Sequence, residues 1–190
     1  MTPDAPIAPP PPNPPEGPHR NVALIGFMGA GKTTVGAILA QILGFDFLDT
    51  DKVIEQRQGR RVSDIFATEG EPFFRQLESN LCTELESAHG KVIATGGGLP
   101  VNPHNLASLR RHALVVCLWA SPEVIHARVR SQHHRPLLQT EDPLARIREL
   151  LALRTPAYKG AHLILGVDFR SPGETARHIA NAFRHGVADA

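Results

Sequence analysis

A glycine-rich loop follows a short apolar run near the start of the chain, and it constrains the fold more than any other feature. The run covers residues 22–25, and the loop reads Gly-Phe-Met-Gly-Ala-Gly-Lys-Thr-Thr over residues 26–34. A glycine, four residues and then Gly-Lys-Thr is the pattern of a phosphate-binding loop, which needs a strand before it and a helix after it. The sequence therefore predicts an α/β domain with a nucleotide site at this loop.

Each part of this loop has its own expected role in holding a polyphosphate. The glycines let the backbone curl so that its N–H groups point inward, and the positive end of the following helix adds to the attraction. Lys32 is expected to reach the β- and γ-phosphates, and the Thr33 hydroxyl to hold Mg²⁺. A glycine-rich turn that binds nothing is the alternative, but it leaves the lysine and the threonine unexplained. The expected ATP contacts of the loop are Gly29, Ala30, Gly31, Lys32, Thr33 and Thr34.

Composition narrows the function further. The chain has 190 residues, which suits one domain, and its formal net charge of +1 argues against a general nucleic-acid binder. No apolar run approaches the roughly 20 residues that cross a bilayer, so we expect no membrane partner. Cys82 and Cys117 lie in apolar surroundings and are expected to be buried thiols. We therefore expect a cytoplasmic protein.

Residues 1–19 form a separate block that is dominated by proline. Such a segment cannot bury a core, so we expect a disordered, extended tail in front of a domain over residues 20–186. The tail is either a ligand for a proline-recognising partner or a dispensable extension, and we favour the second interpretation.

Apolar and amphipathic segments alternate along the domain, which favours a parallel sheet flanked by helices. We expect helices over Thr33–Leu43, around Val53–Gln58 and from Pro72 to about Ser87. Three further helices are expected to begin at Ser121-Pro122, Asp142-Pro143 and Ser171-Pro172, because each pair places a capping side chain before a proline. The expected strands are Val22–Ile25, Phe45–Leu48, Lys91–Ala94, Ala113–Trp119 and Leu163–Val167.

Two carboxylates follow the second expected strand, as Asp49-Thr50-Asp51. Ligands gather at the carboxyl ends of parallel strands, so both side chains are expected to face the crevice of the phosphate loop. One carboxylate would assist Mg²⁺, and the other would orient a substrate hydroxyl or accept its proton. The alternative is that they cap the next helix, a role that Asp51 can also fill.

Three consecutive glycines, Gly96, Gly97 and Gly98, follow the third expected strand. They permit unusual backbone angles and let a ligand touch the backbone. This strand ends in Thr95 and glycine rather than in aspartate, so the metal is expected to rest on Thr33 and Asp49.

Four arginines are candidates for anion binding. Arg75 stands three residues before Glu78, which can aim its guanidinium at a planar carboxylate. Arg135 lies in a polar stretch that is either a solvated loop or a mobile lid over a transferring phosphoryl group. Arg154 and Arg128 would by themselves be ordinary exposed helix residues.

Taken together, these segments resemble the shikimate kinases over about residues 20 to 185. The phosphate loop is shared by many NTPases, whereas the other motifs are specific as an ordered set. The resemblance rests on residues 26–36, Asp49-Thr-Asp51, Phe74-Arg75 with Glu78, Thr95-Gly-Gly-Gly98, Arg135-Pro-Leu-Leu138, and Arg154 followed by Tyr158.

The resemblance implies ATP-dependent phosphorylation of the 3-hydroxyl of shikimate, with Mg²⁺, on the way to aromatic amino acids. It also implies a P-loop NTPase fold with a five-stranded parallel sheet in the order 2-3-1-4-5 and a mobile lid, and we expect a monomer. By similarity, Lys32, Asp51 and Arg135 are catalytic. Shikimate would be bound by Asp51, Arg75, Arg154 and the three glycines Gly96, Gly97 and Gly98, and adenine would lie near Arg128 and Arg170.

Two other functions remain open at this point. One is another small P-loop kinase, such as a gluconate-type or nucleotide kinase, which need not keep both carboxylate-binding arginines. The other is an ATP-binding module without catalysis, which has no need of Lys32, Asp51 and Arg135 together.

Overall fold

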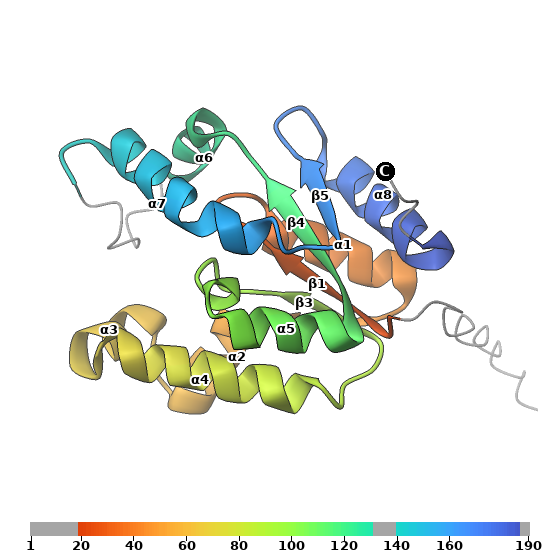
Figure 1. Ribbon diagram of the computed structural model, residues 1–190, viewed down its shortest axis with the longest axis horizontal. Coiled ribbons are helices and arrows are strands. Elements are labelled where there is room, and N and C mark those ends of the chain that lie inside the picture. Colours follow the sequence, from red (N-terminus) through yellow and green to blue (C-terminus); the bar gives the residue numbers. More distant parts are fainter. Residues whose placement is uncertain (1–18, 131–139, 187–190) are drawn as a thin grey trace, which may run out of the picture.

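Five parallel strands form the central sheet, in the order β2-β3-β1-β4-β5, in a computed structural model that describes residues 19–130 and 140–186 (Figure 1). This topology confirms the α/β fold and the strand order that the resemblance implies. The strands are β1 (Asn21–Ile25), β2 (Asp46–Asp49), β3 (Lys91–Ala94), β4 (Ala113–Trp119) and β5 (Leu163–Gly166).

The middle of the sheet is covered on both faces. All residues of β1 are buried, and so are all residues of β4 except Trp119. A parallel strand with helices above and below it must be apolar on both sides, which explains the continuous apolar runs in the sequence. The edge strand β2 is more exposed and carries an aspartate at each end, Asp46 and Asp49.

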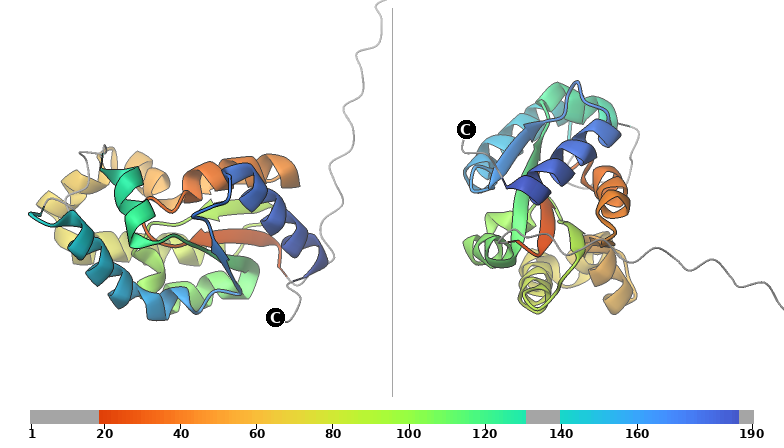
Figure 2. Two further views of the ribbon diagram at one scale, coloured as in Figure 1. Left: turned by 90° about the horizontal axis from the view of Figure 1, so that it is seen from above. Right: turned by 90° about the vertical axis from the view of Figure 1, so that its right-hand side faces the viewer.

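Helices form a layer on each side of the sheet (Figures 1 and 2). On one face α1 (Lys32–Leu43) packs beside α8 (Pro172–His185), and on the other α5 (Pro103–His112) packs against β4. Three helices gather next to α5 at one end of the molecule. These are α2 (Thr50–Gln58), α3 (Val62–Thr68) and α4 (Gly70–Leu85), while α6 (Pro122–Val129) packs on α7 (Pro143–Tyr158).

The three predicted helix starts are confirmed. The side chains of Ser121, Asp142 and Ser171 each accept a hydrogen bond from a backbone N–H in the first turn of the helix that follows. In α8 the cap is reciprocal, because the Glu174 side chain accepts a hydrogen bond from the Ser171 N–H. Local side-chain chemistry is therefore sufficient to start these helices.

Other helix boundaries differ from the predictions. Helix α4 begins at Gly70 rather than at Pro72. Pro72 lies in the first turn, where backbone N–H groups have no partner within the helix, so the N–H that proline lacks is not needed. Helix α2 begins at Thr50, so Asp51 is helical. Two helices, α3 and α5, and the short 3-10 helix η1 (Leu99–Val101) were not expected.

Three further expectations concern the cysteines, a membrane-spanning helix and the segments outside the described residues. Both cysteines are buried and unbonded, as predicted. No helix within the described residues is long and apolar enough to span a bilayer. Residues 1–18 of the expected tail and the expected lid residue Arg135 lie outside the described residues.

Candidate active site

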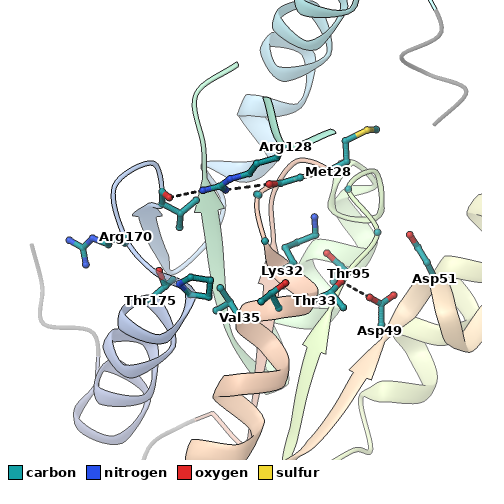
Figure 3. A pocket seen from close by; sticks show the side chains of 18 residues that line it. Met28, Lys32, Thr33, Val35, Asp49, Asp51, Thr95, Arg128, Arg170 and Thr175 are labelled. Atoms are coloured by element: carbon teal, nitrogen blue, oxygen red, sulfur yellow. Dashed lines mark hydrogen bonds between the residues drawn. The ribbon is translucent and has the colours of Figure 1, made fainter. Parts of the chain in front are cut away.

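A cavity of about 440 Å³ opens at the carboxyl ends of the strands, as the fold predicts (Figure 3). It runs from the phosphate loop and the end of β2 at one side to the loop between β5 and α8 at the other. Its lining residues are Met28, Gly29, Ala30, Gly31, Lys32, Thr33, Thr34, Val35, Asp49, Asp51, Thr95, Gly96, Gly97, Arg128, Val167, Arg170, Pro172 and Thr175.

The phosphate loop has the curled backbone that the motif requires. Gly26, Gly29 and Gly31 have φ angles of 132°, 78° and 96°, which side chains disfavour, and α1 begins directly afterwards. The Lys32 ammonium donates to the carbonyl oxygens of Gly26 and Phe27, both at 2.9 Å. Its charge is thereby held inside the curve of the loop and close to the start of the helix, where a polyphosphate would lie.

Two oxygen ligands suitable for Mg²⁺ meet at the edge of the cavity. The Thr33 hydroxyl donates to Asp49 Oδ2 at 2.9 Å, and Figure 3 shows the two side chains facing each other. A hydroxyl and a carboxylate that leave room for phosphate oxygens and water suit this hard cation. Asp49 also caps α2, because its Oδ1 accepts from the Lys52 N–H at 3.4 Å. The helix cap is therefore Asp49, and not Asp51.

Asp51 is largely buried at the inner wall of the cavity. Its Oδ1 atom is buried and has no hydrogen-bond partner among the described residues. Burial and the nearby charge of Asp49 raise its pKa to about 6, although Lys32 opposes the shift. A carboxylate with this pKa is placed to exchange a proton near neutral pH.

Glu78, on α4, is fully buried close to Asp51. Its Oε2 accepts from Arg75 Nη1 at 2.7 Å, as the sequence spacing predicts, while its Oε1 has no partner in the part of the chain that is described. Burial raises its pKa to about 7, despite the opposing charge of Arg75. The sequence indicated that Glu78 aims Arg75, but it did not indicate that Glu78 is a second buried carboxylate beside Asp51.

The three glycines are needed for a different reason from the one predicted. Gly96, Gly97 and Gly98 have no left-handed φ angles; instead, side chains approach them closely. A Cβ on Gly96 would lie 2.5 Å from Asp51 Oδ1, and a Cβ on Gly98 would lie 2.6 Å from both terminal nitrogens of Arg75. None of the three therefore needs to be glycine for a left-handed backbone, and neighbouring side chains occupy the space that a Cβ would fill.

Gly97 joins the two halves of the site. A Cβ there would lie 3.3 Å from Arg154 Nη1 and 3.4 Å from the Gly26 carbonyl oxygen in the phosphate loop. Its own carbonyl accepts a hydrogen bond from the Tyr158 hydroxyl at 2.8 Å. The glycine loop therefore lies directly between the phosphate loop and helix α7.

Arg75 and Arg154 flank this glycine loop next to the cavity, although neither lines the cavity itself. Arg154 is only 9% exposed and lies over the Phe27 ring, 5.3 Å from its centroid, so it is not an ordinary surface arginine. Arg75 lies near the rings of Phe66 and Phe74. Both guanidinium groups thus lie beside aromatic rings, an arrangement that suits recognition of a planar carboxylate.

The far end of the cavity is held together by Arg128. This exposed side chain donates to the Gly29 carbonyl at 3.3 Å and to the Val167 carbonyl at 3.2 Å, which links the phosphate loop to the β5–α8 loop. Arg170 also lines this end (Figure 3). The lining residues Val167 and Thr175 were not predicted, since only their position next to the capped start of α8 hints at them.

Comparison with known proteins gives a consistent result. The chain matches the family model described as shikimate kinase over residues 28–184. The shikimate kinase of Caldanaerobacter subterraneus subsp. tengcongensis is 43% identical over 164 residues, which cover 86% of this chain and 96% of the relative. A solved structure of shikimate kinase from Acinetobacter baumannii in complex with shikimate has a TM-score of 0.84 at 37% identity, covering 90% of this chain and 96% of that one.

A gluconokinase is also similar in structure, but more distantly. The enzyme from Sinorhizobium meliloti 1021 has a TM-score of 0.54 at 17% identity and covers 87% of this chain and 91% of that chain. At this identity the likeness shows a common fold and nothing about the acceptor.

Proposed function

The chain belongs to the shikimate kinase family, and we propose that it transfers the γ-phosphoryl group of ATP to the 3-hydroxyl of shikimate. One observation carries the proposal for this site. Gly97 lies against both the phosphate loop and Arg154, while its neighbours Gly96 and Gly98 lie against Asp51 and Arg75. A small acid that is bound at this glycine loop would sit beside the end of a polyphosphate held by the neighbouring loop.

The nucleotide would be held by the phosphate loop and the far end of the cavity. Backbone N–H groups of residues 29–34 and the Lys32 ammonium would bind the phosphates. Arg128 and Arg170 would lie near the adenine, since both line the end of the cavity away from Asp51. This division leaves the end near Asp51 for the acceptor.

Thr33 and Asp49 would hold Mg²⁺ together with phosphate oxygens and water. Bound there, the ion would offset the charge of the phosphates. The two side chains that would hold the ion already lie together, because the Thr33 hydroxyl donates to Asp49 Oδ2 at 2.9 Å. Among the described residues no cluster of three or more His, Cys, Asp or Glu side chains forms an all-protein metal site, which agrees with the way Mg²⁺ is usually bound with a nucleotide.

The acceptor would be oriented by opposite charges at its two ends. Arg75 and Arg154 would bind the carboxylate, and the backbone of Gly96, Gly97 and Gly98 would approach the ring closely, because no Cβ stands in the way.

Asp51 would then accept a hydrogen bond from the reacting hydroxyl. With a pKa of about 6 it is ionised at neutral pH, and it would orient the oxygen for attack and take its proton as the new P–O bond forms.

Charge stabilisation would do most of the remaining work, because phosphoryl transfer needs little covalent help. Lys32, which is among the described residues, would supply one positive charge next to the phosphates. Arg135, which lies outside the described residues, would supply a second positive charge from the lid. All of these groups come from one chain, so we propose that the protein acts as a monomer. We also propose that it acts in the cytoplasm, without a nucleic-acid or membrane partner.

A substrate panel tests this function. ADP release should be measured with shikimate, gluconate and nucleoside monophosphates as acceptors, each at the same ATP and Mg²⁺ concentrations. We expect turnover with shikimate alone. Turnover only with another acceptor would establish a different P-loop kinase, and ATP binding without turnover of any acceptor would favour a non-catalytic module.

A further inference from the structure

Each of the three nitrogens of the Arg75 guanidinium group donates a hydrogen bond to a protein carboxylate. Its Nη1 donates to Glu78 Oε2 at 2.7 Å. Its Nε and Nη2 both donate to one oxygen of Glu71, at 3.0 and 2.6 Å. Glu71 stands four residues earlier on α4, so the helix itself places the two side chains side by side.

A carboxylate that binds arginine through two parallel hydrogen bonds needs one complete edge of the guanidinium group. Gly98 lies close to the edge formed by Nη1 and Nη2, since a Cβ there would be 2.6 Å from both nitrogens and 2.8 Å from Cζ. The edge formed by Nε and Nη2 is the other edge that can donate hydrogen bonds to two carboxylate oxygens. Both of these nitrogens already donate to Glu71.

The two acidic partners of Arg75 differ in how easily they can leave. The Glu78 side chain is 1% exposed and is enclosed by the protein, whereas the Glu71 side chain is 58% exposed. Glu71 can therefore turn into solvent at little cost, because an exposed ion pair contributes only weakly to stability.

We propose that Glu71 occupies the substrate-binding edge of Arg75 in the empty site, and that the carboxylate of the acceptor replaces it. This inference rests on the proposed function, since it takes the acceptor to be shikimate. The exchange makes Glu71 a specificity-determining residue. The carboxylate of a ligand accepts the hydrogen bonds that Arg75 otherwise donates to Glu71. A ligand without a carboxylate cannot replace Glu71 in this way.

The exchange predicts that removing the charge of Glu71 increases the affinity for shikimate. Glu71→Gln weakens the internal competitor and leaves Arg75 and Glu78 in place, so shikimate should bind more tightly, by roughly two- to five-fold, the range that an exposed ion pair contributes. The KM for ATP and kcat should not change. Glu71→Ala should act in the same direction, which guards against an effect of the glutamine amide.

The experiment is calorimetric titration of the full-length protein with shikimate, accompanied by KM measurements for both substrates. Glu84→Gln is the matched control, because Glu84 lies on the same helix, is similarly exposed and pairs with Arg57. Its affinity for shikimate should equal that of the wild type. The methyl ester of shikimate supplies a neutral probe, whose affinity should be the same for the Glu71→Gln variant and the wild type.

The possible results separate the inference from the function. Tighter binding of shikimate, but not of its ester, to both Glu71 variants supports the exchange. Unchanged or weaker binding overturns it and makes Glu71 a residue that only holds Arg75 in position, while the wild type still binds and turns over shikimate. If the wild type binds ATP but no shikimate, the proposed function fails and the exchange fails with it.

Discussion

Asp51 and Glu78 each direct a buried oxygen at the same glycine. Asp51 Oδ1 and Glu78 Oε1 would lie 2.5 and 2.9 Å from a Cβ on Gly96, and within the described chain neither atom has a hydrogen-bond partner. Burial raises the pKa of both groups, and the charge of Asp51 further raises that of Glu78. The acceptor end of the site therefore holds two carboxylates that bind protons near neutral pH, and several measurements can test this.

The rate should fall on the acidic side of neutrality. In the proposed reaction Asp51 can take the proton of the hydroxyl only when it is ionised, and its pKa is about 6, so kcat/KM for shikimate should fall about tenfold per pH unit below that value. Asp51→Asn should lower kcat by about 10²- to 10⁴-fold at pH 7. The measurement is a pH–rate profile between pH 5 and pH 8, and a profile that stays flat down to pH 5 would remove the assigned role of Asp51.

The same two groups should make the fold less stable as the pH rises. A carboxyl whose pKa is raised in the folded state binds its proton more tightly there, so the folded state loses stability between the unfolded pKa near 4 and the folded pKa of about 6 for Asp51 or about 7 for Glu78. Relative to the wild type, Asp51→Asn and Glu78→Gln should gain on the order of 1–3 kcal/mol of unfolding free energy between pH 4 and pH 8. Urea unfolding at the two pH values measures this; no difference would show that both groups are ionised without cost, and an opposite trend would show that folding lowers their pKa values.

Gly98→Ala should damage shikimate binding without unfolding the protein. Its Cβ would meet the terminal nitrogens of Arg75 at 2.6 Å, and the end of a long side chain can move aside. The displaced arginine would lose charge-assisted hydrogen bonds to the substrate, so KM for shikimate should rise about ten- to a hundred-fold while KM for ATP stays the same. Gly166→Ala is the control, since no described atom lies within 4 Å of its Cβ. Equal effects of the two variants would contradict the assignment of Arg75 to the acceptor.

Lys32→Ala should abolish most turnover. In the proposed reaction the ammonium stabilises the charge that develops on the transferring phosphoryl group, so its loss should lower kcat by at least about 100-fold. Circular dichroism and thermal unfolding should show an intact fold. Lys52→Ala removes an exposed lysine from α2 and should leave kcat unchanged. Near-normal turnover of the Lys32 variant would mean that another group carries the charge.

Removal of residues 1–18 should have almost no effect. The described fold begins at His19, whose ring lies 4.8 Å from that of His162, so the cut preserves this ring pair. Turnover should be unchanged, and the melting temperature should shift by less than about 2 °C, which for a domain of this size corresponds to less than about 1 kcal/mol of unfolding free energy. A larger change in either would show that the proline-rich segment docks on the domain.

Local signals in the sequence predicted the parts of the fold that local chemistry determines. The phosphate loop and the caps at Ser121, Asp142 and Ser171 act within a few residues and were confirmed. Helix α5 was missed although Asn102-Pro103 carries the same signature as those three starts, and the Asn102 side chain indeed caps it at 3.0 Å. Helix α3 is one short segment of seven residues with a single buried side chain, Ile65, so its apolar period is too weak to recognise.

The acceptor end of the site was harder to predict, because its properties come from tertiary packing. Nothing in the local sequence distinguishes the buried Arg154 from an exposed one. The burial of Glu78 and the approach of four side chains to the glycine loop arise only when α2, α4 and α7 come together around that loop. The Glu71–Arg75 pair has a spacing that can be read from the sequence, but the two hydrogen bonds on which the proposed exchange rests are seen only in the structure.

Two hydrogen bonds to backbone carbonyl groups join helices α6 and α7 to two different loops of the site. Arg128, on α6, holds the carbonyl of Gly29, and Tyr158, at the end of α7, holds the carbonyl of Gly97. Because α6 and α7 pack against each other, one pair of helices holds both the phosphate loop, at Gly29, and the glycine loop, at Gly97.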